Sequence, residues 1–333
     1  MMKKIIKIKF VDFYQSFNKE DNDFINALRE CFDVELSDQP DYLFYSVFGY
    51  EHLKYNCIRI FYTGECYTPN FNECDYAIAF DRLSFGDRYL RIPLYNILQY
   101  KPEYERLKNR PVFSETDLKA KKGFCSFVVS NCFADDVRAV FYDKLSQYKT
   151  VASGGRFRNN IGGAVADKKN FQSEYKFAIA FENTSYDGYC TEKLMEAFTA
   201  GTIPIYWGDP GVVKDFNPES FINAHDFNSF DEVVARVKEI DNDDALYLKI
   251  RNANPLLNSN TDSGLAGFLY HIVDQDIEKA HRRPDSIPAK NETAFKLRHV
   301  FFETKIYSKY KKVCNQIQRF RTGTILTRKR NKQ

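Results

Sequence analysis

The sequence YKFAIAFENTSYDGYCTEKLMEAFTAGTIPIYWGDP occupies residues 175–210 and carries the pattern that decides the fold. An apolar run over 176–181 predicts a buried strand, and a polar loop follows it. The apolar spacing within 192–200 predicts a helix, and a second apolar run over 202–207 predicts the next strand. Strand, helix and strand in this order are typical of a parallel sheet with helical crossovers, so the segment indicates an α/β fold.

The predicted helix begins where a nucleotide-binding site is expected in such folds. Thr191 is placed to cap the helix, and Glu192 and Lys193 fall in its first turn. Free backbone N–H groups and the helix dipole attract a diphosphate there, and the Glu192 carboxylate can accept hydrogen bonds from ribose hydroxyls. Taken alone, this pair of charged residues is more often the start of an ordinary capped helix.

The rest of the chain repeats the same alternation. Before the deciding segment we predict strands over 5–13, 42–48, 58–62, 76–80, 89–94 and 124–130, with helices over 24–32 and 136–148. Amphipathic helices over 230–240 and 267–281 follow it. A charged stretch over 101–122 interrupts the pattern, and we place a domain boundary near Lys119. The prediction is therefore two Rossmann-like domains, 1–118 and 119–290, facing across a cleft, followed by a tail over 291–333.

The composition indicates a globular protein without a structural metal. Hydrophobic residues make up 44% and charged residues 28% of the chain. The eight cysteines include no Cys-x-x-Cys pair, so zinc is not expected, and without an export signal we expect the thiols to be reduced. No apolar run approaches the ~20 residues that cross a bilayer. Three Asp-x-Asp pairs, beginning at 21, 241 and 274, are better explained as solvated acids than as metal ligands.

Three segments together resemble the α1,3-fucosyltransferases, the family that uses GDP-fucose. Residues 181–210 resemble the donor-binding motif of that family. FYTGECYTPNFNECDYAIAFD, residues 61–81, resembles the acceptor-side motif of its bacterial members. SNCFADDVRAVFYDKL, residues 130–145, followed by SGGRFRNN, residues 153–160, resembles their phosphate-side segment. The resemblance runs in order over about residues 57–225 and is nearest to the bacterial Lewis-antigen enzymes.

The resemblance implies a GT-B fold with the acceptor domain first and the donor domain second. It implies inverting transfer of L-fucose from GDP-β-L-fucose to the 3-hydroxyl of GlcNAc in N-acetyllactosamine, which is Lewis x synthesis, with fucosylated lipopolysaccharide as the end product. The donor-binding positions that it implies are Arg158, Asn183, Tyr189, Glu192 and Lys193. Because the two cations among them would neutralise the diphosphate, a divalent metal would be at most stimulatory and no other cofactor is required.

Glu65 matches the residue that the family is thought to use as general base. It follows the predicted strand over 58–62 and a turn glycine, Gly64, and a positioned carboxylate contributes ~10²–10⁴-fold to a proton transfer. The usual Gly-Glu-Asn of the family is Gly64-Glu65-Cys66 here, which puts in doubt a role for position 66 and leaves Glu65 intact. Without the resemblance, a surface acid in a turn is the simpler interpretation.

The charge is concentrated at the end of the sequence. Residues 295–333 hold twelve Lys or Arg and one acid, so this segment carries +11 and the remainder −8 of the overall +3. Apolar residues recur there at helical spacing, at Ile306, Tyr310, Val313, Ile317 and Phe320. A basic amphipathic helix predicts attachment to an anionic membrane surface, and the resemblance implies a cytoplasmic protein that is peripheral on the inner membrane. A disordered end and a homodimer contact remain the alternatives.

Two other functions remain open from the residues alone. One is an inverting GT-B transferase that uses another nucleotide sugar or acceptor. The other is a non-catalytic nucleic-acid-binding protein, which the acidic body and the lack of a recognised motif disfavour. We therefore expect no nucleic-acid partner, and affinity for GDP should survive removal of residues 295–333.

Overall fold

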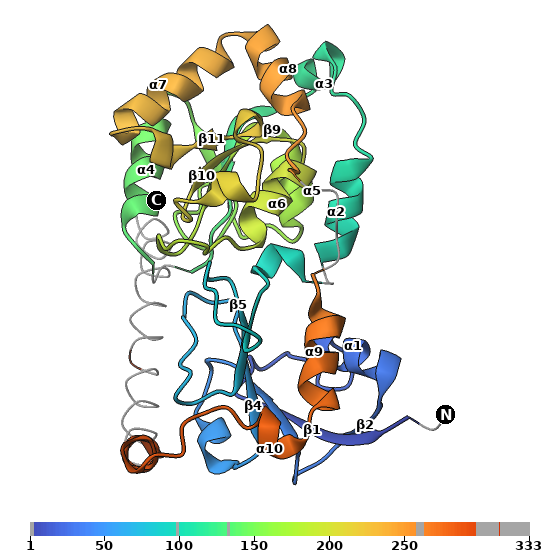
Figure 1. Cartoon of the computed structure of the whole chain (residues 1–333). Helices are drawn as coiled ribbons and strands as arrows, with labels where there is room; N and C mark the ends of the chain where they lie inside the picture. The colour runs from blue at the N-terminus through green and yellow to red at the C-terminus, as the bar shows by residue number, and fades with distance from the viewer. Residues whose placement is uncertain (1–2, 98–99, 132–133, 258–262, 298–312, 314–333) are drawn as a thin grey trace. The chain divides into compact units, whose positions relative to one another are not determined.

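The computed structural model describes residues 3–97, 100–131, 134–257 and 263–297, with the single residue 313 (Figure 1). The described residues form two compact units, each with its own sheet. The first unit takes residues 3–79, 83–90 and 264–297, and the second takes 80–82 and the described residues of 91–263. Among these residues, no helix combines the length and apolar character needed to cross a membrane.

The first unit is built on a sheet with the strand order β2-β1-β3-β4-β5-β6. The strands are β1 (Ile5–Val11), β2 (Asp33–Leu36), β3 (Tyr42–Tyr45), β4 (Ile58–Tyr62), β5 (Tyr76–Ala79) and β6 (Tyr89–Arg91). From β2 through β5 the neighbouring strands are parallel. Val11, Tyr45 and Phe61 lie opposite one another in the register, so β1, β3 and β4 end at the same edge.

The connections after β1 and β3 leave the first sheet toward opposite faces. The elements concerned are α1 (Asp23–Cys31) and the short 3₁₀ helix η1 (Glu51–Lys54). On one face, Phe24 of α1 packs on Phe44 with ring centroids 5.3 Å apart. On the other, His52 of η1 stacks on Tyr45 at 4.0 Å. Since Phe44 and Tyr45 are adjacent on one strand, their side chains point to opposite faces, and β1 and β3 form the topological switch point of this sheet.

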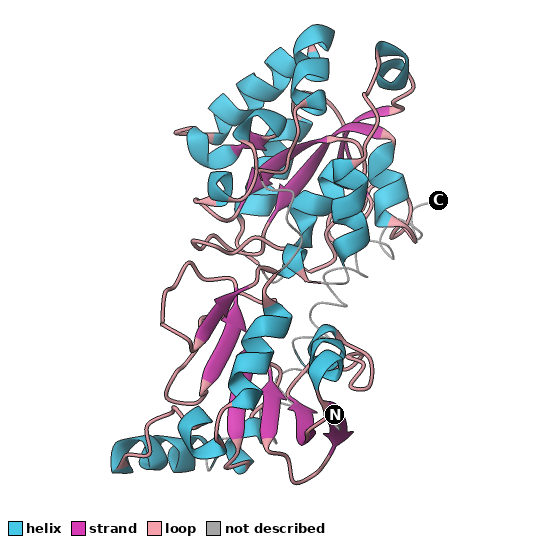
Figure 2. Cartoon of the chain, turned by 45° about the vertical axis from the view of Figure 1, so that its right-hand side comes forward, coloured by secondary structure: helices cyan, strands magenta, loops and turns pink. Residues whose placement is uncertain are grey.

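The second unit is built on a fully parallel sheet with the order β11-β10-β9-β7-β8. Its strands are β7 (Gly123–Phe127), β8 (Val151–Ser153), β9 (Tyr175–Phe181), β10 (Ile203–Trp207) and β11 (Ile222–Asn223). Its helices are α2 (Lys101–Lys108), α3 (Glu115–Lys119), α4 (Val137–Ser146), α5 (Lys168–Ser173), α6 (Glu192–Thr199), α7 (Phe230–Asp241) and α8 (Asp244–Asn252). Figure 2 shows helices on both faces of this sheet.

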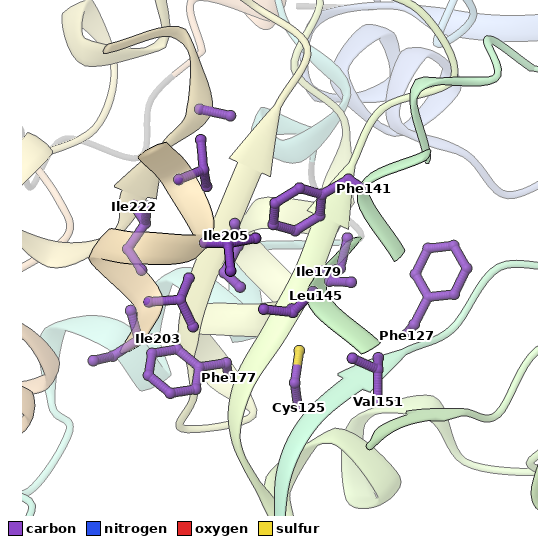
Figure 3. Packing of buried hydrophobic residues seen from close by; sticks show 14 of the residues in the cluster. Cys125, Phe127, Phe141, Leu145, Val151, Phe177, Ile179, Ile203, Ile205 and Ile222 are labelled. Atoms are coloured by element: carbon purple, nitrogen blue, oxygen red, sulfur yellow. The ribbon is translucent and has the colours of Figure 1, made fainter. Parts of the chain in front are cut away.

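The alternation of large and small residues along β9 determines which helix covers which face. Phe177 and Ile179 point to one face and pack with Phe141 of α4 in a buried apolar cluster (Figure 3). Ala178 and Ala180 point to the other face and belong to the cluster that contains the apolar side of α6. Because α4 follows β7 and α6 follows β9, the connections after these neighbouring strands also go to opposite faces. The switch point of this sheet therefore lies between β7 and β9.

The predicted α/β class with two Rossmann-like units is confirmed. The predicted strand over 58–62 coincides with β4, and the helix over 24–32 agrees with α1 to within one residue. The strand β2 escaped prediction because it is a short, mostly exposed edge strand with little apolar pattern. The charged stretch over 101–122, for which no secondary structure was predicted, contains the helices α2 and α3. A capping box formed by Ser114 and Asp117 begins α3 despite its few apolar residues.

The compact units divide the chain differently from the predicted boundaries near 119 and 290. Helices α2 and α3 belong to the second unit. The helix predicted over 267–281 is two helices, α9 (Leu265–Asp274) and α10 (Ile277–Ala280). It does not close the second domain as predicted, because Phe268 of α9 packs on Tyr76 of the first unit, with ring centroids 6.2 Å apart. The apolar stripe predicted in the tail lies outside the described residues, apart from Val313.

Candidate functional site

Polar side chains from both connections meet at the switch point of the second unit. Asn183 follows β9, and Arg138 is the second residue of α4, which follows β7. A guanidinium Nη1 of Arg138 donates a hydrogen bond to Asn183 Oδ1 at 3.0 Å. Open parallel sheets bind ligands outside the carboxyl ends of their strands at such a point.

A buried carboxylate, Glu182, ties together the two ends of the loop over 183–190. Glu182 is 0% exposed and follows the last residue of β9. It accepts a hydrogen bond from the Thr191 backbone N–H at 2.7 Å, and the Thr191 hydroxyl lies 2.9 and 2.8 Å from its two carboxylate oxygens. Its second oxygen also lies 2.7 Å from the Lys193 ammonium. A buried carboxylate is costly unless it is paired in this way.

This ion pair keeps Lys193 charged while most of its side chain is withdrawn from water. Burial by itself would lower the pKa of Lys193, but attraction to Glu182 and then Glu192 holds that pKa above its ordinary value. Burial raises the pKa of Glu182, and the neighbouring ammonium opposes that rise. An ammonium has three donors, and two of them go to Glu182 and Thr191. One donor of Lys193 is thus left for a ligand, as far as the described residues show.

Thr191 is the N-cap residue of α6, as predicted, but its side chain does not cap the helix. Its hydroxyl is directed to Glu182 and accepts from Lys193 at 2.9 Å, and it makes no capping hydrogen bond. The prediction that Thr191 satisfies the first-turn N–H groups is therefore wrong. The physical reason is that the hydroxyl donates its proton to the buried Glu182 carboxylate while its oxygen accepts from the Lys193 ammonium, so the oxygen does not accept from the first-turn N–H groups.

The other residues predicted from the donor motif differ in how accessible they are. Glu192 is half-buried at the first position of α6, and its charge influences both Glu182 and Lys193. Tyr189 is 2% exposed, and its ring packs on Phe80 with centroids 5.1 Å apart. The buried Tyr189 ring therefore packs beneath the loop over 183–190 and stabilises it.

Arg158, another predicted donor-binding residue, contacts the α4 helix of the second unit. Its backbone is left-handed, with a φ of 51°, and its Nη1 pairs with Asp143 Oδ1 of α4 at 2.5 Å. Its guanidinium lies 5.6 Å from the ring centroids of both Tyr142 and Phe157. No hydrogen bond or ion pair found in the described part of the chain joins Arg158 to residues 182–193. The arginine that does meet them, Arg138, was not singled out from the sequence, although it stands in the phosphate-side segment over 130–145.

A second buried acid, Asp209, holds the middle of the same loop. Asp209 is 0% exposed and forms a two-bond contact with Arg82, at 2.8 and 2.7 Å. It also accepts from the backbone N–H groups of Gly188 and Gly211, each at 2.8 Å. Gly188 has a φ of +86°, and a Cβ there would lie 2.6 Å from the Phe80 carbonyl oxygen. The glycine is required both by its backbone conformation and by this close approach.

Glu65, the predicted base, belongs to the first unit. It follows β4 by three residues, at the edge where β1 and β3 also end. Its backbone is held in a turn, because its N–H donates to Thr63 Oγ1 at 2.9 Å and its carbonyl accepts from Tyr67 N at 2.7 Å. Its side chain is exposed. No group of His, Cys, Asp or Glu side chains suited to a metal ion occurs within the described ranges.

Two family models match the chain in order. Residues 8–98 match the α-(1,3)-fucosyltransferase FucT N-terminal domain, and residues 118–252 match the C-terminal model of glycosyltransferase family 10 (fucosyltransferase). The α-(1,3)-fucosyltransferase FucT of Helicobacter pylori is 43% identical over 246 residues, which are 65% of this chain and 50% of that protein. The mouse 4-galactosyl-N-acetylglucosaminide 3-α-L-fucosyltransferase 9 is 34% identical over 140 residues, 41% of this chain and 38% of that protein. The chain thus spans about half or less of the length of these curated relatives.

Solved structures agree with these matches over most of the chain. A crystal structure of an α1,3-fucosyltransferase with GDP has a TM-score of 0.72 and 33% identity, covering 85% of this chain and 94% of that one. A crystal structure of an α1,3-fucosyltransferase with GDP-fucose has a TM-score of 0.70 and 34% identity, covering 83% and 92%.

Proposed function

Because the chain belongs to the α1,3-fucosyltransferases of glycosyltransferase family 10, we propose that it transfers L-fucose from GDP-β-L-fucose to a glycan hydroxyl with inversion. The acceptor we propose is N-acetyllactosamine, fucosylated at the 3-hydroxyl of GlcNAc. This rests on the relatives, among them the mouse enzyme whose name specifies a 4-galactosyl-N-acetylglucosaminide.

The observation that supports the donor most directly is the charge arrangement at the switch point of the second unit. Lys193 and Arg138 bring two cations to the carboxyl edge of the sheet, beside the N-terminus of α6. Cations and free N–H groups are what a nucleoside diphosphate requires. In the proposed site they neutralise the charge that develops as GDP leaves, and Glu192 and Asn183 supply polar contacts to ribose and fucose. Tyr189 keeps the loop in shape.

The proposed reaction is a single displacement. The acceptor oxygen bonds to C1 of fucose as the bond from C1 to the GDP oxygen breaks, and the hydroxyl proton passes to the Glu65 carboxylate. No covalent enzyme intermediate is needed. We expect no metal requirement either, and activity that persists in excess chelator tests this; full loss, restored by Mg²⁺ or Mn²⁺, would contradict it.

The first experiment is transfer from GDP-fucose to N-acetyllactosamine by wild type, Glu65→Gln and Glu35→Gln, followed by linkage analysis of the product. We expect a 3-linked product and a loss of ~10² or more in kcat for Glu65→Gln. Glu35, an exposed acid on the edge strand β2, is the matched control and should leave kcat unchanged. If Glu65→Gln is as active as wild type, another residue must be the general base. If wild type binds GDP but transfers no fucose, the acceptor must be a different glycan. Faster transfer from another nucleotide sugar would contradict the proposal that GDP-fucose is the donor.

We also propose that the basic tail attaches the protein to an anionic membrane surface. This proposal rests on the sequence of residues outside the described ranges, where each basic residue contributes ~1 kcal/mol near anionic lipid. Full-length protein should sediment with phosphatidylglycerol vesicles and not with phosphatidylcholine vesicles, and a chain lacking residues 298–333 should sediment with neither while still binding GDP. If the stripe instead pairs two chains, sedimentation equilibrium will show a dimer that this truncation dissociates.

A further inference from the structure

We propose that Tyr14 and Phe48 form a stacking surface for a neutral pyranose ring of the glycan acceptor, at the switch point of the first unit. This inference rests on the proposed fucosyl transfer and extends it by assigning residues that recognise the acceptor. We call Tyr14 and Phe48 the edge aromatic pair.

The edge aromatic pair is exposed although its members touch. Tyr14 is 48% exposed and Phe48 is 53% exposed. Their ring centroids lie 6.2 Å apart with an interplanar angle of 84°, so the two rings meet edge to face. Water therefore covers about half of each residue. Large exposed apolar residues that gather on one surface mark a binding site more often than isolated ones do.

The pair lies where the topology of the first sheet favours a ligand. Tyr14 belongs to the connection after β1 and Phe48 to the connection after β3. These strands are neighbours and their connections leave toward opposite faces, as α1 and η1 show. The second unit has its candidate site at the equivalent position, between β7 and β9. Glu65 follows β4, the next strand along, at the same edge.

A buried polar side chain fixes the two loops against each other. The Asp12 backbone, with a φ of 59°, accepts from Phe48 N at 2.9 Å. The Asp12 carboxylate accepts from the N–H groups of Glu51 and His52, each at 2.9 Å, and a Cβ at Gly49 would collide with it. The Asp12 bonds hold the backbone of the loop that carries Phe48, and the Tyr14 carbonyl accepts from Phe17 N at 3.0 Å, so both loops lose little conformational freedom when a ligand binds.

The surroundings of the pair favour a neutral sugar over an anion. The loops DFYQSFN, residues 12–18, and SVFGY, residues 46–50, contain no Lys or Arg. The N-terminus of α1 is already capped, since Asn22 accepts from Phe24 N and Ile25 N. Gln15 and Ser16 are exposed beside Tyr14 and can exchange hydrogen bonds with sugar hydroxyls. Aromatic faces with a few neutral polar groups suit the apolar C–H side and the polar rim of a pyranose.

The test compares Tyr14→Ala and Phe48→Ala with wild type in the full chain, with N-acetyllactosamine as acceptor. We expect the KM for the acceptor to rise at least tenfold in each variant, with kcat within threefold and the KM for GDP-fucose unchanged. Tyr14→Phe and Phe48→Tyr should retain the wild-type acceptor KM. Tyr270→Ala is the matched control, because Tyr270 is 44% exposed in the same unit and also contacts an aromatic ring, with its centroid 5.7 Å from that of Phe32.

Direct binding of N-acetyllactosamine, followed by saturation-transfer NMR, keeps this inference separate from the proposed reaction. Wild-type binding that is lost in both alanine variants and kept in Tyr270→Ala supports the stacking surface even if no fucose is transferred. An unchanged acceptor KM and unchanged binding in the alanine variants overturn it while the transferase function stands. Absence of glycan binding by the wild type also overturns it.

Discussion

At the scale of the residue, the candidate donor site depends on charges that satisfy one another before any ligand binds. Glu182 is fully buried, and Lys193 and Thr191 supply its hydrogen bonds. The Glu182 carboxylate therefore fixes the position of the Lys193 ammonium and also joins the two ends of the loop over 183–190. Removing one partner of a buried pair leaves the other charge without compensation, which costs more than the pair contributes.

We predict that Glu182→Gln lowers the free energy of unfolding by about 3 kcal/mol, because Lys193 then keeps a buried charge with a neutral partner. Urea denaturation at neutral pH measures this. Glu196→Gln is the control, since Glu196 pairs with Lys168 near the surface, and it should cost about 1 kcal/mol or less. Equal losses in the two variants would contradict a special role for Glu182.

The two arginines near the phosphate-side segment can be told apart by GDP affinity. Arg138 contacts Asn183 at the switch point, whereas Arg158 pairs with Asp143. We predict that Arg138→Lys, which keeps the charge and loses the fork of donors, raises the Kd for GDP by about tenfold. Arg158→Lys should change it less than threefold. Isothermal titration calorimetry measures the Kd for GDP in both variants. A larger increase in Arg158→Lys than in Arg138→Lys would assign the phosphate contact to Arg158.

At the scale of the element, the loop between β9 and α6 is determined by contacts with distant parts of the sequence. Asp209 holds Gly188 from the end of β10, and Ser185 donates to the Gly208 carbonyl at 2.7 Å. Phe80 contacts the loop from a segment more than a hundred residues earlier. The helix α6 therefore begins after a loop that is held by two other segments, one at residues 208–209 and one at Phe80.

We predict that Gly188→Ala destabilises the protein by at least about 2 kcal/mol, because a side chain there is strained at positive φ and meets the Phe80 carbonyl. Gly267→Ala is the matched control. Gly267 lies in α9 with no atom within 4 Å of an added Cβ, so alanine should stabilise by roughly 0.5–1 kcal/mol. Thermal unfolding of both variants measures the difference, and shifts of the same sign would refute this explanation.

At the scale of the whole molecule, the chain returns to its first unit after completing the second. A network of polar side chains inside the first unit joins the early and late parts of the sequence. Asp12 contacts His52 at 2.7 Å, His52 contacts Glu73 at 3.3 Å, and Glu73 pairs with Lys296. Asp12, directly after the first strand, and Lys296, beyond α10, thereby share one network. The loop fixed by Asp12 and His52 also carries Phe48.

The network predicts a loss of stability in acid. Burial by itself would raise the pKa of Glu73, but the bonds from His52 and Lys296 lower it from 4.5 to about 2. A carboxyl whose folded pKa is depressed stabilises the protein above its unfolded pKa, and this contribution disappears as the pH falls from about 4.5 to about 2. Denaturant unfolding of wild type and Glu73→Gln should show a stability difference that shrinks across this window. A difference independent of pH would contradict the assignment.

The local pattern of the sequence was sufficient for the class of the fold and for most of its elements. Apolar runs such as 58–62 and 176–181 need only the period of their side chains to be recognised as strands. The motif over 181–210 likewise predicted Asn183, Glu192 and Lys193 as one set, because they are close in sequence and stand at the two ends of one loop.

Tertiary structure alone decided which side chains meet. It assigned α9 to the first sheet, turned the Thr191 hydroxyl from the helix to Glu182, and brought Arg138 to Asn183 while Arg158 went to Asp143. It also brought Tyr14 and Phe48 together from two connections. Each of these outcomes depends on partners that lie in other segments of the chain, or on which of several neighbouring groups bonds to one hydroxyl. The period of a single segment holds no information about such partners, because they become neighbours only when the strands pair in their register.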